Sequence, residues 1–149
     1  VTFLTIHISR AVMEAAAEGR AGTMTRLLAV TVLTSFDQDD LAELGYPAAI
    51  ADLVALRVRK AVESGIDGIV CSPLEVANVR AIGGPKLKLV TTGVRSPGAA
   101  TGDQKRVATP AEAIENGADY LVIGRQVTRA QDPQGACEQI LNEISAVSR

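Results

Sequence analysis

A chain of 149 residues with 47% hydrophobic residues can bury a substantial core, and this length favours one domain. Charged residues make up 21% of the sequence and the formal net charge is -2, so no basic field indicates a nucleic-acid partner. The aromatic content of 3%, with no Trp, also argues against a surface on which bases stack.

Five short apolar segments predict buried strands, and helical patterns lie between them. The strands are expected at 3–8, 27–34, 68–72, 88–94 and 120–125, and the helices at 10–19, 37–44, 48–64, 73–82, 110–116 and 133–147. The strand segments are continuously apolar, which is typical of parallel strands covered on both faces. This alternation predicts an α/β fold with a parallel sheet, of the (β/α) TIM-barrel type with five βα units visible. A doubly wound open sheet is the alternative.

Local motifs support repeated βα units. "SPLE" (72–75) and "TPAE" (109–112) are each a capping box with Pro at the first helical position. The segments 61–70 and 113–122 match at five of ten positions, and each places an Asp before a strand. These residues, Asp67 and Asp119, are expected at the stability face of a barrel, so we do not predict them to be catalytic.

Ligands of parallel α/β folds lie beyond the carboxyl ends of the strands. The residues expected there are His7, Thr34, Ser35, Ser72, Gly93, Arg95, Gly124 and Arg125. In two of the five strand exits, Gly is followed closely by Arg, a pairing suited to phosphate because Gly leaves the backbone N–H accessible and Arg offers a fork of donors. The long basic loop within "LVTTGVRSPGAATGDQKR" (89–106) is therefore predicted to form part of a phosphate site, with a merely solvated loop as the alternative.

No apolar run approaches the roughly 20 residues that a membrane helix needs, so no membrane partner is expected. Cys71 and Cys137 are far apart and fit a reducing cytoplasm better than a disulfide. Both thiols are expected to be buried, and His7 is expected to be packed or hydrogen-bonded rather than catalytic. No basic leader precedes the first apolar segment, which agrees with a cytoplasmic location.

The whole chain resembles the C-terminal part of the bacterial orotidine 5'-phosphate decarboxylase family. The motifs that carry the resemblance are "TIH" (5–7), "LLAVTVLTS" (27–35), "DLAELGY" (40–46), "GIVCSPLEV" (68–76), "TTGVR" (91–95), "GDQKRVATPAEAI" (102–114) and "GADYLVIGRQVTRA" (117–130). The resemblance implies a carboxy-lyase that converts orotidine 5'-phosphate (OMP) into UMP and CO2 without metal or cofactor, as a homodimer.

The resemblance also implies roles for individual residues. The implied substrate-binding residues are Thr34, Arg95, Gln104, Gly124 and Arg125. Thr34 would contact the nucleotide, with Ser35 beside the pyrimidine edge. Arg95 and Gln104 would close over the substrate, and Gly124 and Arg125 would hold the 5'-phosphate.

The segment from Ser96 to Lys105 would act as a lid that excludes water. Lys105 and Arg106, at the end of the lid, are expected to be solvated surface charges. In relatives a Pro usually stands where Thr92 lies in "TTGVR", so we expect a looser turn here.

The family's catalytic Asp and Lys residues, in a D-x-K-x-x-D motif, have no counterpart in this sequence. The nearest string, "DQKRVA" (103–108), lacks the second Asp, and Lys60, Lys86 and Lys88 are expected on a helix or at a strand start. No catalytic residue is therefore predicted. A complete (β/α)8 barrel takes about 250 residues, so residues 1–149 are interpreted as the C-terminal part of a single barrel domain.

Five strands alone would leave two open edges and an uncovered interior face. The missing units are expected in a longer polypeptide or in another chain. Three functions remain open at this point: a decarboxylase portion that is active when completed, a non-catalytic nucleotide- or phosphate-binding half-barrel, and a structural fragment without a function of its own.

Overall fold

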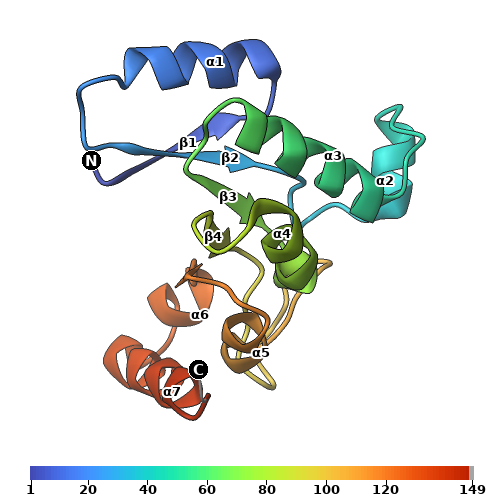
Figure 1. Cartoon of the computed structure of the whole chain (residues 1–149). Coiled ribbons are helices and arrows are strands. Elements are labelled where there is room, and N and C mark those ends of the chain that lie inside the picture. Colours follow the sequence, from blue (N-terminus) through green and yellow to red (C-terminus); the bar gives the residue numbers. More distant parts are fainter. Residues whose placement is uncertain (148–149) are drawn as a thin grey trace.

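The computed structural model describes residues 1–147 and contains one five-stranded sheet (Figure 1). The strands are β1 (Phe3–His7), β2 (Arg26–Val30), β3 (Gly68–Cys71), β4 (Lys88–Thr91) and β5 (Tyr120–Leu121). All neighbouring pairs are parallel, and the strand order is β1-β2-β3-β4-β5. Each strand pairs with the next one along the chain, as in a TIM-type barrel. A doubly wound sheet would need a reversal of strand order, so that alternative is wrong.

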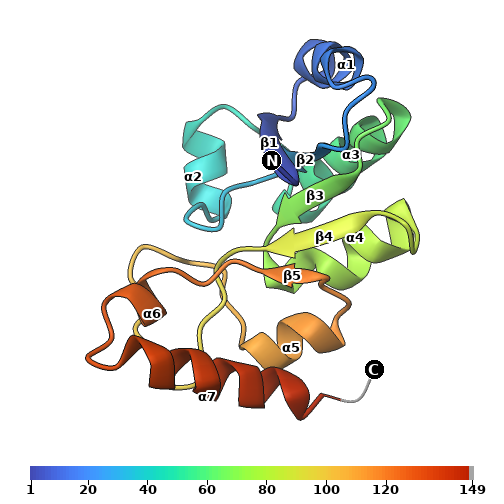
Figure 2. The ribbon, with the colours of Figure 1, turned by 90° about the vertical axis from the view of Figure 1, so that its left-hand side faces the viewer.

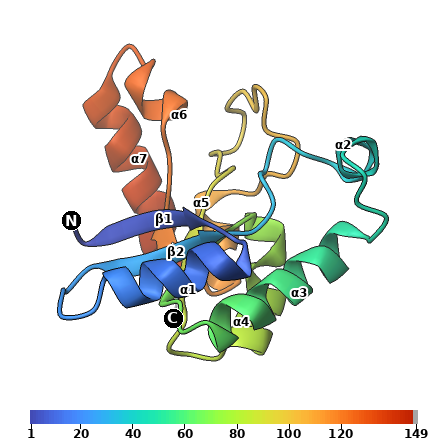
Figure 3. The ribbon, with the colours of Figure 1, turned by 90° about the horizontal axis from the view of Figure 1, so that it is seen from above.

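Helices lie at the six predicted places, and a further short helix at Arg125–Thr128 was not predicted. They are α1 (Arg10–Gly19), α2 (Gln38–Glu43), α3 (Ile50–Glu63), the 3-10 turn η1 (Pro73–Glu75), α4 (Val76–Gly83), α5 (Pro110–Glu115), α6 (Arg125–Thr128) and α7 (Pro133–Ser145). Helices α1, α3 and α4 lie along one face of the strands (Figure 3). Within residues 1–147, no helix has both the length and the apolar character needed to cross a membrane.

All five strands end earlier than predicted, β1 and β3 by one residue and the other three by three or four. The segments expected as strands at 27–34, 88–94 and 120–125 leave the sheet after Val30, Thr91 and Leu121. In the last case the expectation is also wrong in kind, because Arg125 begins α6. Beyond the ends of β2 and β4, Val32 and Val94 are buried in loops at the sheet edge, and apolar content alone does not separate these loops from the strands.

The two faces of the sheet bury different side chains, because successive residues of a strand point to opposite sides. One face packs against the helices, and its strand residues include Leu27, Ala29, Ile69, Cys71 and Leu89. The other face carries a smaller buried cluster, Leu28, Val70 and Val90. The expectation of an uncovered interior face is therefore wrong at the centre of the sheet.

An aromatic contact explains how this second face is covered. Phe3 of β1 packs against the Leu28 cluster, and its ring contacts the Tyr120 ring of β5 at 5.2 Å between centroids, edge to face. The sheet is curved enough to bring its two outer strands together across its concave side. Beyond this contact, Leu4 and Val122 on the two outer strand segments remain exposed.

The capping boxes form as predicted. The Ser72 N–H donates to Glu75 Oε2 at 3.2 Å, and the Ser72 hydroxyl caps the 3-10 turn that precedes α4. At the start of α5, the Thr109 N–H donates to Glu112 Oε2 at 2.8 Å and Thr109 Oγ1 accepts from the Glu112 N–H. These two helices therefore begin where their sequences specify.

The two strand-start aspartates are structural, as the sequence predicted. Asp119 Oδ2 accepts from the Leu89 N–H at 2.9 Å and from Arg80 at 2.8 Å. Burial would raise the pKa of Asp119, but these hydrogen bonds outweigh it and hold the pKa below its ordinary value. Asp67 makes the equivalent bond, accepting from the Leu27 N–H at 2.7 Å. Each carboxylate thus fastens the start of the preceding strand.

The two cysteines differ in burial. Cys71 is buried in β3, and this burial raises the pKa of its thiol to about 12. Cys137 is exposed, so the expectation that both thiols are buried is wrong for it. It lies on α7 beside the apolar groove next to β5, where no further element covers the helix in the described part of the chain.

We predict that Gly68→Ala destabilises the fold by about 1–3 kcal/mol, because the core has no room for the added methyl group. A Cβ at this position would lie 2.5 Å from the Lys88 carbonyl oxygen and 2.6 Å from Leu28 Cδ2. Urea unfolding followed by circular dichroism measures the loss.

Gly19→Ala is the matched control, because a Cβ there meets nothing within 4 Å. Gly19 is the last residue of α1, where Ala is a better helix former, so this variant should match or exceed the wild type in stability. Equal stability of Gly68→Ala and wild type would contradict the packing argument.

Candidate substrate-binding site at the strand exits

The loops that follow the strands gather, together with α6, at one edge of the sheet (Figure 2). Because the strands are parallel, their carboxyl ends all meet at this edge. The residues that the sequence placed at strand exits lie here, and several of them fall into two groups. One group surrounds Thr34, and the other surrounds Arg125.

Thr34 is the meeting point of three segments. Its side chain is buried, and its hydroxyl donates to Gln104 Oε1 and lies 3.2 Å from the Thr92 hydroxyl. Thr34 comes from the loop after β2, Thr92 from the loop after β4 and Gln104 from the predicted lid. Ser35 follows in the same loop as Thr34 and is half-buried. The structure thus brings together two of the predicted substrate residues, Thr34 and Gln104.

Arg125 belongs to the second group, around a cavity of about 240 Å³. The residues that line it are Arg95, Ala99, Ala100, Thr101, Gly102, Arg125, Gln126 and Arg129. Three arginines therefore face one small space. Gly124 precedes them as the N-cap of α6. A cavity of this size and charge suits an anion such as a phosphate group, whose oxygens accept charge-assisted hydrogen bonds from arginine.

Arg95 is buried, lines this cavity and is held by two backbone carbonyls, one of them in the lid segment. Its Nε donates to the Ala100 carbonyl at 3.2 Å, and its Nη1 donates to the Val94 carbonyl at 2.7 Å. The structure thus places Arg95 in the same group as Arg125, while its role in closing over a substrate stays a prediction.

Gln126 and Arg129 were missed in the sequence. Gln126 accepts a hydrogen bond from the Ser96 N–H at 3.0 Å and donates one to the Ser96 hydroxyl at 2.6 Å. These two bonds fix the first residue of the lid segment. Arg125 and Arg129 have the i, i+4 spacing that places two side chains on one face of a helix. That spacing could have been recognised, but the strand expected at 120–125 hid it.

The Arg125 side chain forms an ion pair with Asp103 in this structure. The hydrogen bond from Arg125 lowers the pKa of Asp103 below its ordinary value. Asp103 and Gln104 are neighbours in the lid segment, and they reach into different groups: Asp103 to Arg125 and Gln104 to Thr34. The lid segment therefore connects the two halves of the site.

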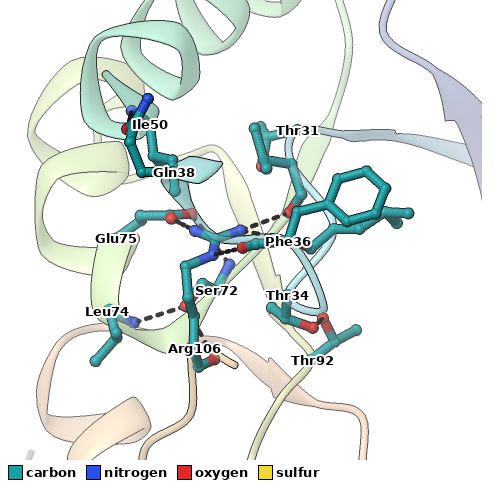
Figure 4. A network of polar contacts seen from close by, with 12 residues as sticks. Thr31, Thr34, Phe36, Gln38, Ile50, Ser72, Leu74, Glu75, Thr92 and Arg106 are labelled. Carbon is teal, nitrogen blue, oxygen red and sulfur yellow. Dashed lines mark hydrogen bonds and ion pairs between the residues drawn. The ribbon is translucent and has the colours of Figure 1, made fainter. Parts of the chain in front are cut away.

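The expectation of solvated surface charges is wrong for Arg106, whereas Lys105 does lie on the surface. Lys105 is half-exposed but forms ion pairs with Asp37 at 2.8 Å and Asp40 at 2.7 Å, which raise its pKa. The hydrogen bond from Lys105, with one from the Asp40 backbone, lowers the pKa of Asp37 to about 2. Arg106 is buried and forms an ion pair with the buried Glu75 (Figure 4). Their partners lie far away in the sequence, so no local signal indicated them.

His7 ends β1 with an exposed side chain that forms no hydrogen bond within residues 1–147. The expectation of a packed or hydrogen-bonded histidine is therefore wrong. Lys60 lies on α3, and Lys86 and Lys88 lie before and at the start of β4, all as predicted and all away from the strand exits. In the described part of the chain, no three His, Cys, Asp or Glu side chains are grouped so that they could hold a metal ion.

A family model described as "Orotidine 5'-phosphate decarboxylase / HUMPS family" matches residues 1–140. The chain belongs to this family. An orotidine 5'-phosphate decarboxylase of Rhodopseudomonas palustris (strain BisA53) is 56% identical over 143 residues, which cover 96% of this chain and 61% of the relative. One of Afipia carboxidovorans is 56% identical over 144 residues, with 97% and 61% covered. The chain thus spans about three fifths of the length of these curated relatives.

Solved structures agree with the family. The crystal structure of orotidine 5'-phosphate decarboxylase from Lactobacillus acidophilus superposes with a TM-score of 0.80 at 36% identity, covering 98% of this chain and 64% of that chain. That similarity confirms the barrel type of the five βα units and, together with the family match, the resemblance inferred from the motifs.

We predict that Asp103→Asn raises the affinity of the chain for inorganic phosphate by about two- to fivefold. The substitution removes the charged carboxylate that pairs with Arg125, whose hydrogen bond lowers the pKa of Asp103. A titration with phosphate at pH 7, followed by nuclear magnetic resonance at the amides of 124–129, measures the affinity.

Asp39→Asn is the matched control. It makes the same change of charge at an exposed residue of α2 that takes part in none of the ion pairs of residues 1–147. Its phosphate affinity should equal that of the wild type. Equal affinities of the Asp103 and Asp39 variants would show that Asp103 does not compete for the cavity.

Proposed function

We propose that this chain forms the substrate-binding portion of an orotidine 5'-phosphate decarboxylase, which converts OMP into UMP and CO2 in de novo pyrimidine biosynthesis. The observation that carries the proposal is the junction of the two groups at the strand exits. An arginine-lined cavity lies at one end of the lid segment, and the Thr34–Gln104 contact lies at the other. A nucleoside monophosphate has the matching pair of features, an anionic phosphate and a base with polar edges.

The proposed binding assigns one half of the ligand to each group. The 5'-phosphate takes the place of Asp103 on Arg125, with Arg95 lining the same cavity. The Thr34 hydroxyl and the Gln104 amide then face the pyrimidine edge, where an unpaired polar group would cost about 1–3 kcal/mol. Gly124, beside Arg125, lets the backbone approach the phosphate closely.

The proposed chemistry needs residues that residues 1–147 do not place at the strand exits. By family resemblance, an Asp and Lys set removes CO2, and the Lys stabilises and then protonates the carbanion at C6 of the pyrimidine. We assign this set to further βα units of one (β/α)8 barrel, of which residues 1–149 form the C-terminal part. The relatives' greater length supports this assignment.

The edge of the sheet at β5 offers a place for these units. A groove of about 520 Å³ between β5 and α7 is lined mainly by apolar side chains, and Leu141 is 60% exposed there. Closure of the barrel would pair a further strand with β5 and cover this groove. We further propose a homodimeric assembly and a cytoplasmic location, both by resemblance to the family.

A second candidate function is a non-catalytic nucleotide- or phosphate-binding half-barrel. The cavity and the Thr34 group are fully formed from residues 1–147, whereas none of the lysines at 60, 86 and 88 lies at a strand exit. This candidate predicts binding without turnover in any assembly. A fragment without function predicts neither binding nor stabilisation by a ligand.

We predict that the chain binds UMP and that Arg125→Ala weakens this binding about tenfold or more, because the phosphate loses a charge-assisted pair. Isothermal titration calorimetry measures both affinities. Arg59→Ala, which removes an exposed arginine of α3, is the control and should bind like the wild type. An unchanged affinity of Arg125→Ala would contradict the phosphate assignment.

We also predict that co-expression with the N-terminal barrel units of the R. palustris relative yields decarboxylation of OMP. Release of CO2 and loss of OMP absorbance measure the turnover. Leu141→Asp should reduce the yield of the assembly because it places a charge in the β5 groove, whereas Leu74→Asp, at a similarly exposed leucine on η1, should not. A well-folded assembly that binds UMP without turnover would refute the decarboxylase and favour the second candidate.

A further inference from the structure

The pair of Arg106 and Glu75 is the most deeply buried charge pair in the described part of the chain, and none of the proposed substrate contacts uses it. Arg106 is 8% exposed and Glu75 is 9% exposed, and their side chains form an ion pair. Removing two charges from water is unfavourable unless the pair is well hydrogen-bonded. The question is therefore what these bonds hold in place.

The guanidinium of Arg106 binds the loop that carries Thr34. Its Nε donates to the Phe36 carbonyl at 2.9 Å, and its Nη2 donates to the carbonyls of Val32 at 3.1 Å and Leu33 at 3.0 Å. These three carbonyls lie on both sides of Thr34 in the sequence. Figure 4 shows the guanidinium between Glu75 and this loop. Only a planar guanidinium, with its several N–H donors, can hydrogen-bond to so many acceptors at once.

The backbone around Arg106 binds the same loop from the other side. The N–H groups of Lys105 and Arg106 both donate to the Thr34 carbonyl, at 3.0 and 3.2 Å. The Ser72 hydroxyl donates to the Arg106 carbonyl at 3.3 Å, which ties the lid base to the exit of β3. Gly93, at a φ of 74°, leaves space here, since a Cβ would lie 2.8 Å from the Arg106 carbonyl.

Glu75 completes the arrangement through its second oxygen. Oε1 pairs with Arg106, while Oε2 accepts from the Ser72 N–H at 3.2 Å. The same carboxylate therefore caps a turn and orients the guanidinium. Since η1 is fixed on β3 by this cap, Glu75 gives Arg106 a rigid support.

We infer that Arg106, oriented by Glu75, is a positioning residue that holds the base of the lid against the loop of Thr34, so that Thr34 and Gln104 contact the pyrimidine together. This inference rests on the proposed function for its ligand. Gln104 lies two residues before Arg106, so the hydrogen bonds at 105 and 106 fix the place from which it reaches Thr34.

The phosphate half of the site is anchored independently. Gln126 of α6 holds Ser96 at the other end of the lid segment, Arg125 is the first residue of α6, and Arg129 is its C-cap. Loss of Arg106 should therefore impair recognition of the nucleoside more than recognition of phosphate. A residue that only stabilises the fold would impair both equally.

The test compares UMP and inorganic phosphate as ligands of the wild type and of Glu75→Gln/Arg106→Met. The double variant removes both charges and leaves no buried charge without a partner. We expect its UMP affinity to fall about tenfold or more, while its phosphate affinity stays within about twofold of the wild type. A UMP affinity within about twofold of the wild type in the folded variant would overturn the inference.

Arg106→Lys keeps the positive charge, but its single ammonium group replaces the guanidinium that hydrogen-bonds to the three loop carbonyls. We expect an affinity for UMP between those of the wild type and the double variant, again with unchanged phosphate binding. If the double variant does not fold, Arg106→Lys alone tests the inference. Equal loss of UMP and phosphate binding in this variant, or no loss of either, would overturn it.

Hydrogen exchange separates this inference from the proposed function. In either variant, the amides of Lys105 and Arg106 should exchange about tenfold faster or more, while the amide of Ile69 in β3 should keep its rate. If the wild type binds neither UMP nor phosphate, the proposed function fails, and the exchange rates still decide whether Arg106 holds the lid base. Faster exchange that includes Ile69 to the same degree would make Arg106 a general stabiliser and overturn the inference.

Discussion

Parallel hydrogen bonding between consecutive strands is the constraint on which the whole site depends. Because β1 to β5 pair in chain order and point the same way, every segment that leaves a strand begins at the same edge. Thr34, Thr92 and Arg125 are far apart in the sequence and are collected there without any contact specific to a ligand. The strand starts, at the far edge of the sheet, contribute to stability, because Asp67 and Asp119 hydrogen-bond to neighbouring strands there. Residues for stability and residues for binding therefore lie at opposite ends of the strands.

The site is a bridge between two anchored ends. The lid segment is held by Gln126 through Ser96 at one end and by Arg106 at the other. Between these anchors, Asp103 and Gln104 each contact one half of the site. A ligand that contacts both halves would bind with a smaller loss of conformational entropy, since the loops need little further ordering. The second candidate function, a binding half-barrel without turnover, uses the same arrangement and differs only in the chemistry that further βα units would supply.

The sequence was sufficient for the fold type, for the helix starts at Ser72 and Thr109 and for the placement of Thr34, Arg95 and Arg125 at the strand exits, because periodicity, capping motifs and strand direction are local properties. Gln104 was indicated only by the resemblance to the family. The sequence was insufficient for α6, since an apolar segment that ends in Gly124 is compatible with either a strand or a packed loop. The partners of Arg106 lie up to 74 residues away, and a buried ion pair depends on how distant loops meet. The exposure of Cys137 depends likewise on which elements cover α7, which its own helical pattern does not specify.

Phe3 and Tyr120 seal the concave side of the sheet by joining its first and last strands. Any strand that enters between β1 and β5 must first part these rings, and an aromatic pair of this kind is worth about 0.5–1.5 kcal/mol. The five βα units therefore bury part of their own interior face without any further strand.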